Sequence, residues 1–150
     1  MATACLQDSH VYALATRDGT LLWRFTCGAA AQSGFALSAD GTVVFFGSFD
    51  GGIYALHAAT GTLKWRYATG GQVGSRPALS SDGTRLYQGS FDGGLYALHA
   101  SDGTLLWRYP TGSAVHCDPA LTPDDRLLVF GSYDGTVYAL NITEHASAYL

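Results

Sequence analysis

The residues of this chain that could do chemistry recur at a fixed spacing. Four aspartates lie 42 residues apart: Asp8, Asp50, Asp92 and Asp134. Carboxylates gathered at one point could hold Ca²⁺, which takes about six to eight oxygen ligands. Three of the four, however, directly precede a glycine, and an aspartate that opens an Asp-Gly turn commonly accepts hydrogen bonds from its own backbone. We therefore interpret these aspartates as turn caps rather than as a repeated acidic site.

The histidines and cysteines give no firmer indication of a metal site. His57 and His99 share the 42-residue interval, which places them one repeat apart, and His10 is out of phase with both. Hydrogen bonds within each repeat are the better interpretation. The three cysteines are odd in number, far apart and outside any Cys-x-x-Cys motif, so the sequence supports neither a disulfide framework nor a zinc site. They are Cys5, Cys27 and Cys117.

The elements that position these residues repeat with the same period. Tyr12, Tyr54, Tyr96 and Tyr138 are each separated by 42 residues, and Trp23, Trp65 and Trp107 keep that spacing. A period of about 40 residues indicates one supersecondary unit that stacks on copies of itself. The chain holds about three and a half such units. The predicted units span residues 1–29, 30–71, 72–113 and 114–150, of which the first is partial, within a single domain 1–150.

Each unit is predicted to contain four short strands. In the third unit these are residues 76–80, 84–91, 94–100 and 104–110, separated by Asp-Gly turns that favour hairpins. Alternation places Leu105, Trp107 and Tyr109 on one face of the last strand, and no segment shows a sustained helical period. One such meander cannot cover both of its faces, but radial stacking can. We predict an all-β fold, a partial β-propeller of four-stranded antiparallel blades.

The string "ALHAATGTLKW" (55–65) carries a family resemblance. It resembles the tryptophan-docking motif Ala-x-Asp-x-x-Thr-Gly-x-x-x-Trp of the pyrroloquinoline-quinone (PQQ)-type propeller repeat, and it recurs in phase at 13–23 and 97–107. The resemblance implies that Trp23, Trp65 and Trp107 are structural residues that dock against the neighbouring blade. His57 and His99 replace the aspartate of the motif. In the last unit the motif decays, with Tyr149 at the tryptophan position.

The resembled family includes quinoprotein dehydrogenases, which hold PQQ and Ca²⁺ in a central funnel. This chain has no adjacent cysteine pair of the kind found in the alcohol dehydrogenases, and no acidic cluster at its predicted strand starts. We therefore predict no catalytic, cofactor-binding or metal-binding residues and no cofactor. The expected function is that of a non-catalytic binding or scaffold module that mediates protein–protein or ligand interaction. The alternative is a fragment of a PQQ-dependent quinoprotein oxidoreductase.

The composition limits the classes of partner that the chain is expected to bind. The chain has 150 residues, 47% of them hydrophobic, with a net charge of −4 and no basic patch, which argues against nucleic acid. Its apolar runs are too short to span a membrane. No secretory signal is evident, and the compartment stays open. The first unit is predicted to lack its innermost strand. The expected partners are therefore a protein, the remaining blades of a larger ring, or a second copy in a homo-oligomer.

The positions at which the units differ indicate where a binding site would lie. The connections between units vary most, and one equivalent position holds Gly34, Arg76 and Asp118 in successive units. Loops on a rigid scaffold are common binding sites. We predict a binding mouth around Arg76, His116 and Asp118, with neutral surface variation as the alternative.

Overall fold

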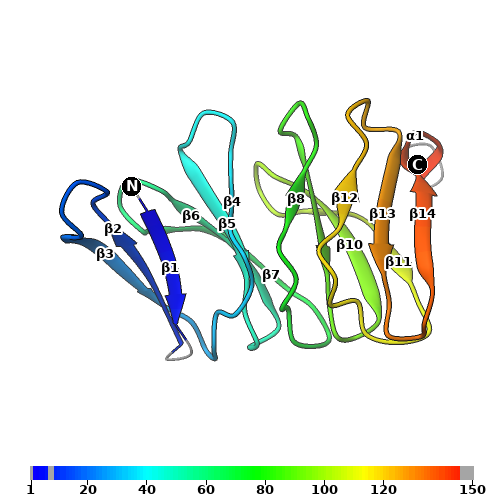
Figure 1. Cartoon of the computed structure of the whole chain (residues 1–150), viewed down its shortest axis with the longest axis horizontal. Coiled ribbons are helices and arrows are strands. Elements are labelled where there is room, and N and C mark those ends of the chain that lie inside the picture. The colour runs from blue at the N-terminus through cyan, green and yellow to red at the C-terminus, as the bar shows by residue number, and fades with distance from the viewer. Residues whose placement is uncertain (1, 7–8, 146–150) are drawn as a thin grey trace.

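The computed structural model describes residues 2–6 and 9–145. Within these residues, fourteen strands form four antiparallel sheets of three, four, four and three strands. The sheets stand side by side in a row, with the two ends of the chain at opposite ends of that row (Figure 1). In the described residues, no helix is both long enough and apolar enough to cross a membrane. The architecture is the predicted partial β-propeller, in which each sheet is one blade.

Each sheet is a meander in which neighbouring strands follow one another in sequence. The first sheet contains β1 (Ala2–Leu6), β2 (His10–Leu14) and β3 (Leu21–Thr26). The second contains β4 (Ala36–Leu37), β5 (Val43–Gly47), β6 (Gly52–His57) and β7 (Leu63–Ala68). The third contains β8 (Ala78–Leu79), β9 (Arg85–Gly89), β10 (Gly94–His99) and β11 (Leu105–Pro110). The fourth contains β12 (Ala120–Leu121), β13 (Leu127–Gly131) and β14 (Val137–Asn141), followed by the helix α1 (Ile142–His145).

The last strand of each of the first three sheets begins with a β-bulge. In the third sheet Ala97 pairs with Trp107 and Leu98 pairs with Leu105, so Leu106 is an extra residue. Residues that pair across strands share a face of the sheet. Leu105 therefore lies on the face opposite Trp107, where it is 45% exposed, and Leu106 packs against the core beside Trp107. The alternation predicted for Leu105 was wrong because a bulge reverses it.

The short helix α1 differs from the sequence-based expectation of strands and turns alone. It occupies the place where the docking motif of the earlier units has its Thr-Gly turn. The Asn141 side chain accepts hydrogen bonds from the backbone N–H of Thr143 at 3.1 Å and from its hydroxyl at 2.6 Å. An asparagine in this position is a favourable helix N-cap. Asp8 and Tyr149, which belong to the predicted repeat, lie outside the described residues.

The hydrophobic core consists of three clusters, one between each pair of neighbouring sheets. Between the second and third sheets, Phe45, Ile53 and Trp65 pack against Leu86 and Leu98. Equivalent clusters join the first sheet to the second and the third to the fourth. We call the face of a sheet that contacts the next sheet its trailing face, and the opposite face its leading face. Each sheet thus gains most of its apolar burial from its neighbours.

The tryptophans pack across these interfaces. The Nε1–H of Trp23 donates to the carbonyl of Ala58 at 2.8 Å, and that of Trp65 to Ala100 at 3.0 Å. Each indole also covers a glycine of the next sheet. A Cβ on Gly103, which has φ of +75°, would lie 2.6 Å from the Trp65 ring. Any larger residue at that position would therefore clash with the indole as well as strain the backbone.

Replacement of Trp65 by alanine should lower the free energy of unfolding by about 3–5 kcal/mol, the usual cost of removing a buried tryptophan side chain. Trp65 is 8% exposed and has a four-stranded sheet on either side of its interface. Urea unfolding would measure the change. The control is Leu63→Ala on the same strand, because Leu63 is 49% exposed. The docking role would be contradicted if Trp65→Ala changed stability as little as a neutral surface change, within about 0.5 kcal/mol.

Candidate binding surface

One edge of the molecule, the lower edge in Figure 1, collects two kinds of loop. The first are the connections between sheets, residues 27–35, 69–77 and 111–119. The second are the turns that join β5 to β6, β9 to β10 and β13 to β14, residues 48–51, 90–93 and 132–136. The backbone N–H of Phe49 donates to Ala30 at 2.9 Å, and that of Phe91 to Gln72 at 2.8 Å. We call this edge the connection rim, because each turn is bonded to the connection that precedes its own sheet.

The repeated aspartates hold these loops together. The Asp50 carboxylate accepts from the backbone N–H of Gly52 in its own turn at 2.8 Å, which is the predicted cap. It also accepts from the N–H of Gly28 in the preceding connection at 2.8 Å. Asp92 and Asp134 make the same bond to Gly70 and Gly112, at 2.7 and 2.9 Å. Each aspartate is therefore a latch between a turn and a connection as well as a turn cap.

A tyrosine and an arginine complete each latch in the second and third sheets. The Tyr54 hydroxyl donates to Asp50 at 2.6 Å and accepts from Nε of Arg66 at 2.9 Å. The Arg66 guanidinium lies 3.6 Å from the Asp50 carboxylate and over the Tyr54 ring. Its NH2 group also donates to the Asp50 carbonyl at 3.4 Å. Arg66 thus contacts both the carboxylate and the backbone carbonyl of Asp50.

The hydrogen bonds and charges of this latch shift the pKa values of Asp50 and Tyr54. Burial acts to raise the pKa of Asp50. The hydrogen bonds from Tyr54, Gly28 and Gly52, with the charge of Arg66, outweigh burial and lower that pKa below its ordinary value of 3.8. Burial, followed by the hydrogen bond to Asp50, raises the pKa of Tyr54 to about 12. The network therefore favours an ionised aspartate and a neutral tyrosine near neutral pH.

Arg76 and Asp118 meet where the connections lead into β8 and β12. The Asp118 carboxylate accepts from the backbone N–H of Arg76 at 2.7 Å, so the pair is joined through the main chain. The Arg76 side chain lies on Gly34, where an added Cβ would be only 2.5 Å from the Arg76 Nε. The three equivalent positions thus form a line across three successive sheets. Arg76 and Asp118 are both exposed.

His116 lies among aromatic rings. Its ring centroid is 5.0 Å from that of Phe91 and 6.0 Å from that of Tyr133, and its Nδ1 lies 3.3 Å from the Tyr133 hydroxyl. Phe91 also contacts Phe49 at a centroid distance of 6.2 Å and Tyr133 at 6.2 Å. We call Phe49, Phe91 and Tyr133 the aromatic row. His116 therefore links the predicted mouth to this row, which the sequence-based prediction missed even though its members are 42 residues apart.

The donor set at this surface does not suit PQQ with Ca²⁺. Calcium needs several oxygen ligands at one point, whereas the carboxylates of Asp50 and Asp92 are already occupied by their own latches. Among the described residues, no three side chains of His, Cys, Asp or Glu type come together as a possible metal site.

The latch should make stability depend on acid pH. Because the folded-state pKa of Asp50 is lowered, its contribution is present above about 3.8 and is lost as the pH falls through the folded-state pKa. Asp50→Asn should lower the free energy of unfolding by about 1.5–3 kcal/mol at neutral pH, the range for hydrogen bonds to charged groups. Urea unfolding at a series of pH values should show this difference narrowing toward pH 3, and Asp92→Asn should behave alike. A difference that stayed constant with pH would contradict the latch.

Comparison with known proteins supports the same architecture. The family model described as outer membrane protein assembly factor BamB matches residues 7–82 and again residues 73–146. No curated protein matches the sequence. Among solved structures, BamB from Moraxella catarrhalis is similar with a TM-score of 0.77 and 22% sequence identity. The similarity covers 98% of this chain and 43% of that one, so this chain spans less than half the length of that relative.

The two matches of the family model together cover nearly the whole chain. The predictions of a PQQ-like repeat and of a partial propeller are confirmed by this match and by the four antiparallel sheets. The chain belongs to the PQQ-like β-propeller family described as outer membrane protein assembly factor BamB.

Proposed function

We propose that this chain is a non-catalytic scaffold module that binds a protein partner through the connection rim. The observation that carries the proposal is the aromatic row, whose rings contact one another across three sheets beside His116. Aromatic side chains provide much of the binding energy at protein interfaces. Tyr133 is 62% exposed, and Phe49 and Phe91 are half-buried. The row therefore offers apolar area to a partner.

The loops that carry this surface are held in place before any partner binds. Asp92 bonds to Gly70, and the hydroxyl of Thr69 donates to the carbonyls of Gly51 and Gly71 at 3.0 and 2.8 Å. The Thr111 hydroxyl makes the equivalent pair of bonds in the next connection. A surface that is ordered in advance loses less conformational entropy when it binds. This favours recognition by a fixed surface over folding on contact.

The charged residues Arg76 and Asp118 on the connection rim are suited to form the polar edge of this contact. Arg76 and Asp118 are exposed and of opposite sign, and Asp118 lies two residues beyond His116, which contacts the aromatic row. Interfaces commonly combine an apolar centre with a polar, partly hydrated edge. The family description as an outer membrane protein assembly factor also supports a protein as the partner. We propose that the partner places an apolar side chain on the aromatic row and polar groups near Arg76 and Asp118.

The contact can be tested by placing a photo-crosslinking phenylalanine derivative at Tyr133 in cells of the source organism. A discrete crosslinked protein is expected, because Tyr133 is the most exposed ring of the row. The matched control carries the same derivative at the exposed Ala39, in the turn between β4 and β5 on the opposite edge. Arg76→Gly with Asp118→Gly should reduce the yield from Tyr133. Equal products from both positions, or none from Tyr133, would contradict the proposal.

We further propose that the module works without a quinone. Mixed with PQQ and Ca²⁺, the purified chain should leave the quinone absorbance unchanged and should show no shift in its melting temperature. A ligand that binds only the folded state would raise that temperature. A saturable change in both signals would instead support the oxidoreductase alternative. The carboxylates that are occupied in the latches are the physical reason to expect no change.

A further inference from the structure

The edge of the molecule opposite the connection rim holds a cavity between the trailing face of the second sheet and the leading face of the third (Figure 1). Its volume is about 590 Å³, within the usual range of small-molecule sites, roughly 300–1,000 Å³. Both walls belong to four-stranded sheets that have a neighbouring sheet on each side. The second sheet supplies Asp40, Val43, Phe45 and Lys64, and the third supplies His99 and Ala100.

Lys64 carries a charge that the equivalent positions of the other sheets lack. It is the extra residue of the β-bulge at the start of β7, as Leu22 and Leu106 are in the first and third sheets. Leu106 packs against the apolar core beside Trp107. In the second sheet, an apolar side chain that would lie over the core between two sheets is therefore replaced by an ammonium group.

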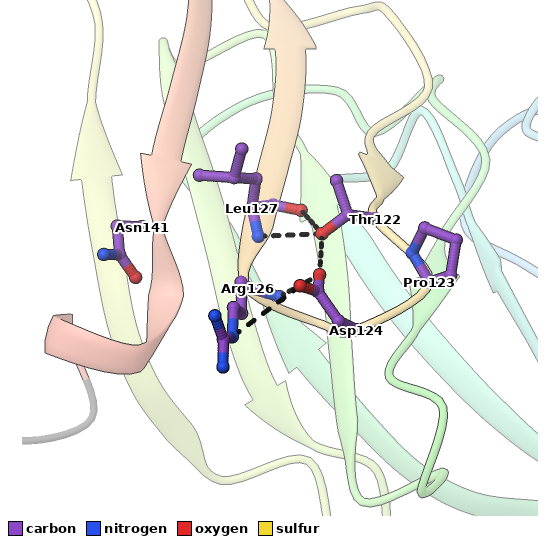
Figure 2. A pocket seen from close by; sticks show the side chains of 6 residues that line it. All are labelled: Thr122, Pro123, Asp124, Arg126, Leu127 and Asn141. Carbon is purple, nitrogen blue, oxygen red and sulfur yellow. Dashed lines mark hydrogen bonds and ion pairs between the residues drawn. The ribbon is translucent and has the colours of Figure 1, made fainter.

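The carboxylate of the cavity, in contrast, belongs to the repeated structure. Asp40 caps the turn between β4 and β5, where it accepts hydrogen bonds from a hydroxyl at 2.6 Å and from a backbone N–H at 3.0 Å. Asp82 caps the equivalent turn of the third sheet. In the fourth sheet Asp124 makes the same bonds with Thr122 at 2.6 Å and Arg126 at 3.2 Å (Figure 2). The lysine is therefore the charged group that is specific to this cavity.

The ammonium group of Lys64 is available to a ligand. Lys64 is exposed, and within the described part of the chain it makes no ion pair. Asp102 is its nearest charged influence. Hydrogen bonds from Thr104 lower the pKa of Asp102, and the charges of His99 and Lys64 lower it further. That carboxylate is held by the backbone N–H and the hydroxyl of Thr104, at 2.9 and 2.7 Å, so Lys64 keeps its three hydrogen-bond donors.

We propose that this cavity binds a small organic anion with an apolar body, of the class of aromatic carboxylates. The anionic group pairs with Lys64 at the mouth of the cavity. The apolar body lies on Val43, Phe45 and Ala100, which are 8%, 2% and 6% exposed and therefore form the floor. A ligand site commonly combines such an apolar lining with a few polar groups that fix orientation.

This site and the connection rim are on opposite edges of the molecule, so the proposed protein contact and the proposed ligand can fail separately. The competing account of Lys64 is an ordinary surface lysine, whose aliphatic stem covers apolar surface while its charge stays in water. That account predicts no preference for an anion, which makes charge the quantity to vary.

The test compares three probes that share a naphthalene body and differ in charge: 2-naphthoate, 2-naphthylmethanol and 2-naphthylmethylamine. Titration of the nitrogen-15-labelled chain, followed by amide correlation spectra, gives each Kd and shows which amides respond. 2-Naphthoate should bind most tightly, with saturable shifts at Thr84, Ala100 and Ser101, which line the cavity. Because the pair with Lys64 is exposed, added salt should weaken this binding.

Substitutions at Lys64 separate the effect of charge from that of shape. Lys64→Gln should weaken 2-naphthoate binding about fivefold, the upper range for an exposed ion pair, and leave the neutral probe unchanged. Lys64→Glu should transfer the preference to the amine. The control is Arg17→Gln, which removes a cation that is 91% exposed, in the turn between β2 and β3. The same spectra show whether each variant is folded.

Four results would overturn the proposal. They are equal affinity for the three probes, shifts that lie away from the cavity, no saturable shift up to the solubility limit of 2-naphthoate, and binding that Lys64→Gln leaves unchanged.

Discussion

Each sheet of this chain has two apolar faces and can bury them only against another sheet. The indole of each docking tryptophan determines how that burial is achieved. Trp65 reaches from its own sheet to the carbonyl of Ala100 and covers Gly103, so it sets both the separation and the register of the two sheets. A left-handed glycine is needed at that point because any side chain would occupy the space of the ring. The second and third units each supply both a tryptophan and a glycine turn that receives the indole of the preceding unit.

The same constraint explains why the connection rim can vary. The tryptophan contacts and apolar clusters hold the sheets, and the aspartate latches hold the turns to the connections. The side chains at the ends of the connections stand outside both of these repeated sets of contacts. Gly34, Arg76 and Asp118 differ in charge, yet each stands two residues before the equivalent short strand β4, β8 or β12. This variation in charge thus falls on loops that are held in place by repeated contacts.

The sequence predicted the strands well because period, turn chemistry and apolar pattern agreed. The predicted strand 94–100 and the observed β10 (Gly94–His99) differ by a single residue. The bulge that turns Leu105 to the opposite face was missed, because it leaves no distinctive residue in the sequence. The candidate surface was predicted less completely. Its variable residues stood out by comparison between units, but the aromatic row did not, since a residue that repeats was assigned to the blade. Only the structure places Phe91 beside His116.

One departure from the repeat lies inside the core and bears on this surface. Phe46 and Phe130 occupy equivalent buried positions, and the third sheet has Gln88 there instead, with no exposed area. Its Nε2 donates to the backbone carbonyl and to the hydroxyl of Ser75, the residue before Arg76. Its Oε1 is buried with no hydrogen-bond partner among the described residues. A buried polar atom left in that state costs about 1–3 kcal/mol. The third sheet therefore exchanges an apolar contact for a polar anchor on the connection that carries Arg76. Arg76 supplies the positive charge of the candidate surface. The hydrogen bonds from Gln88 to Ser75 therefore oppose movement of Arg76 when it contacts a partner.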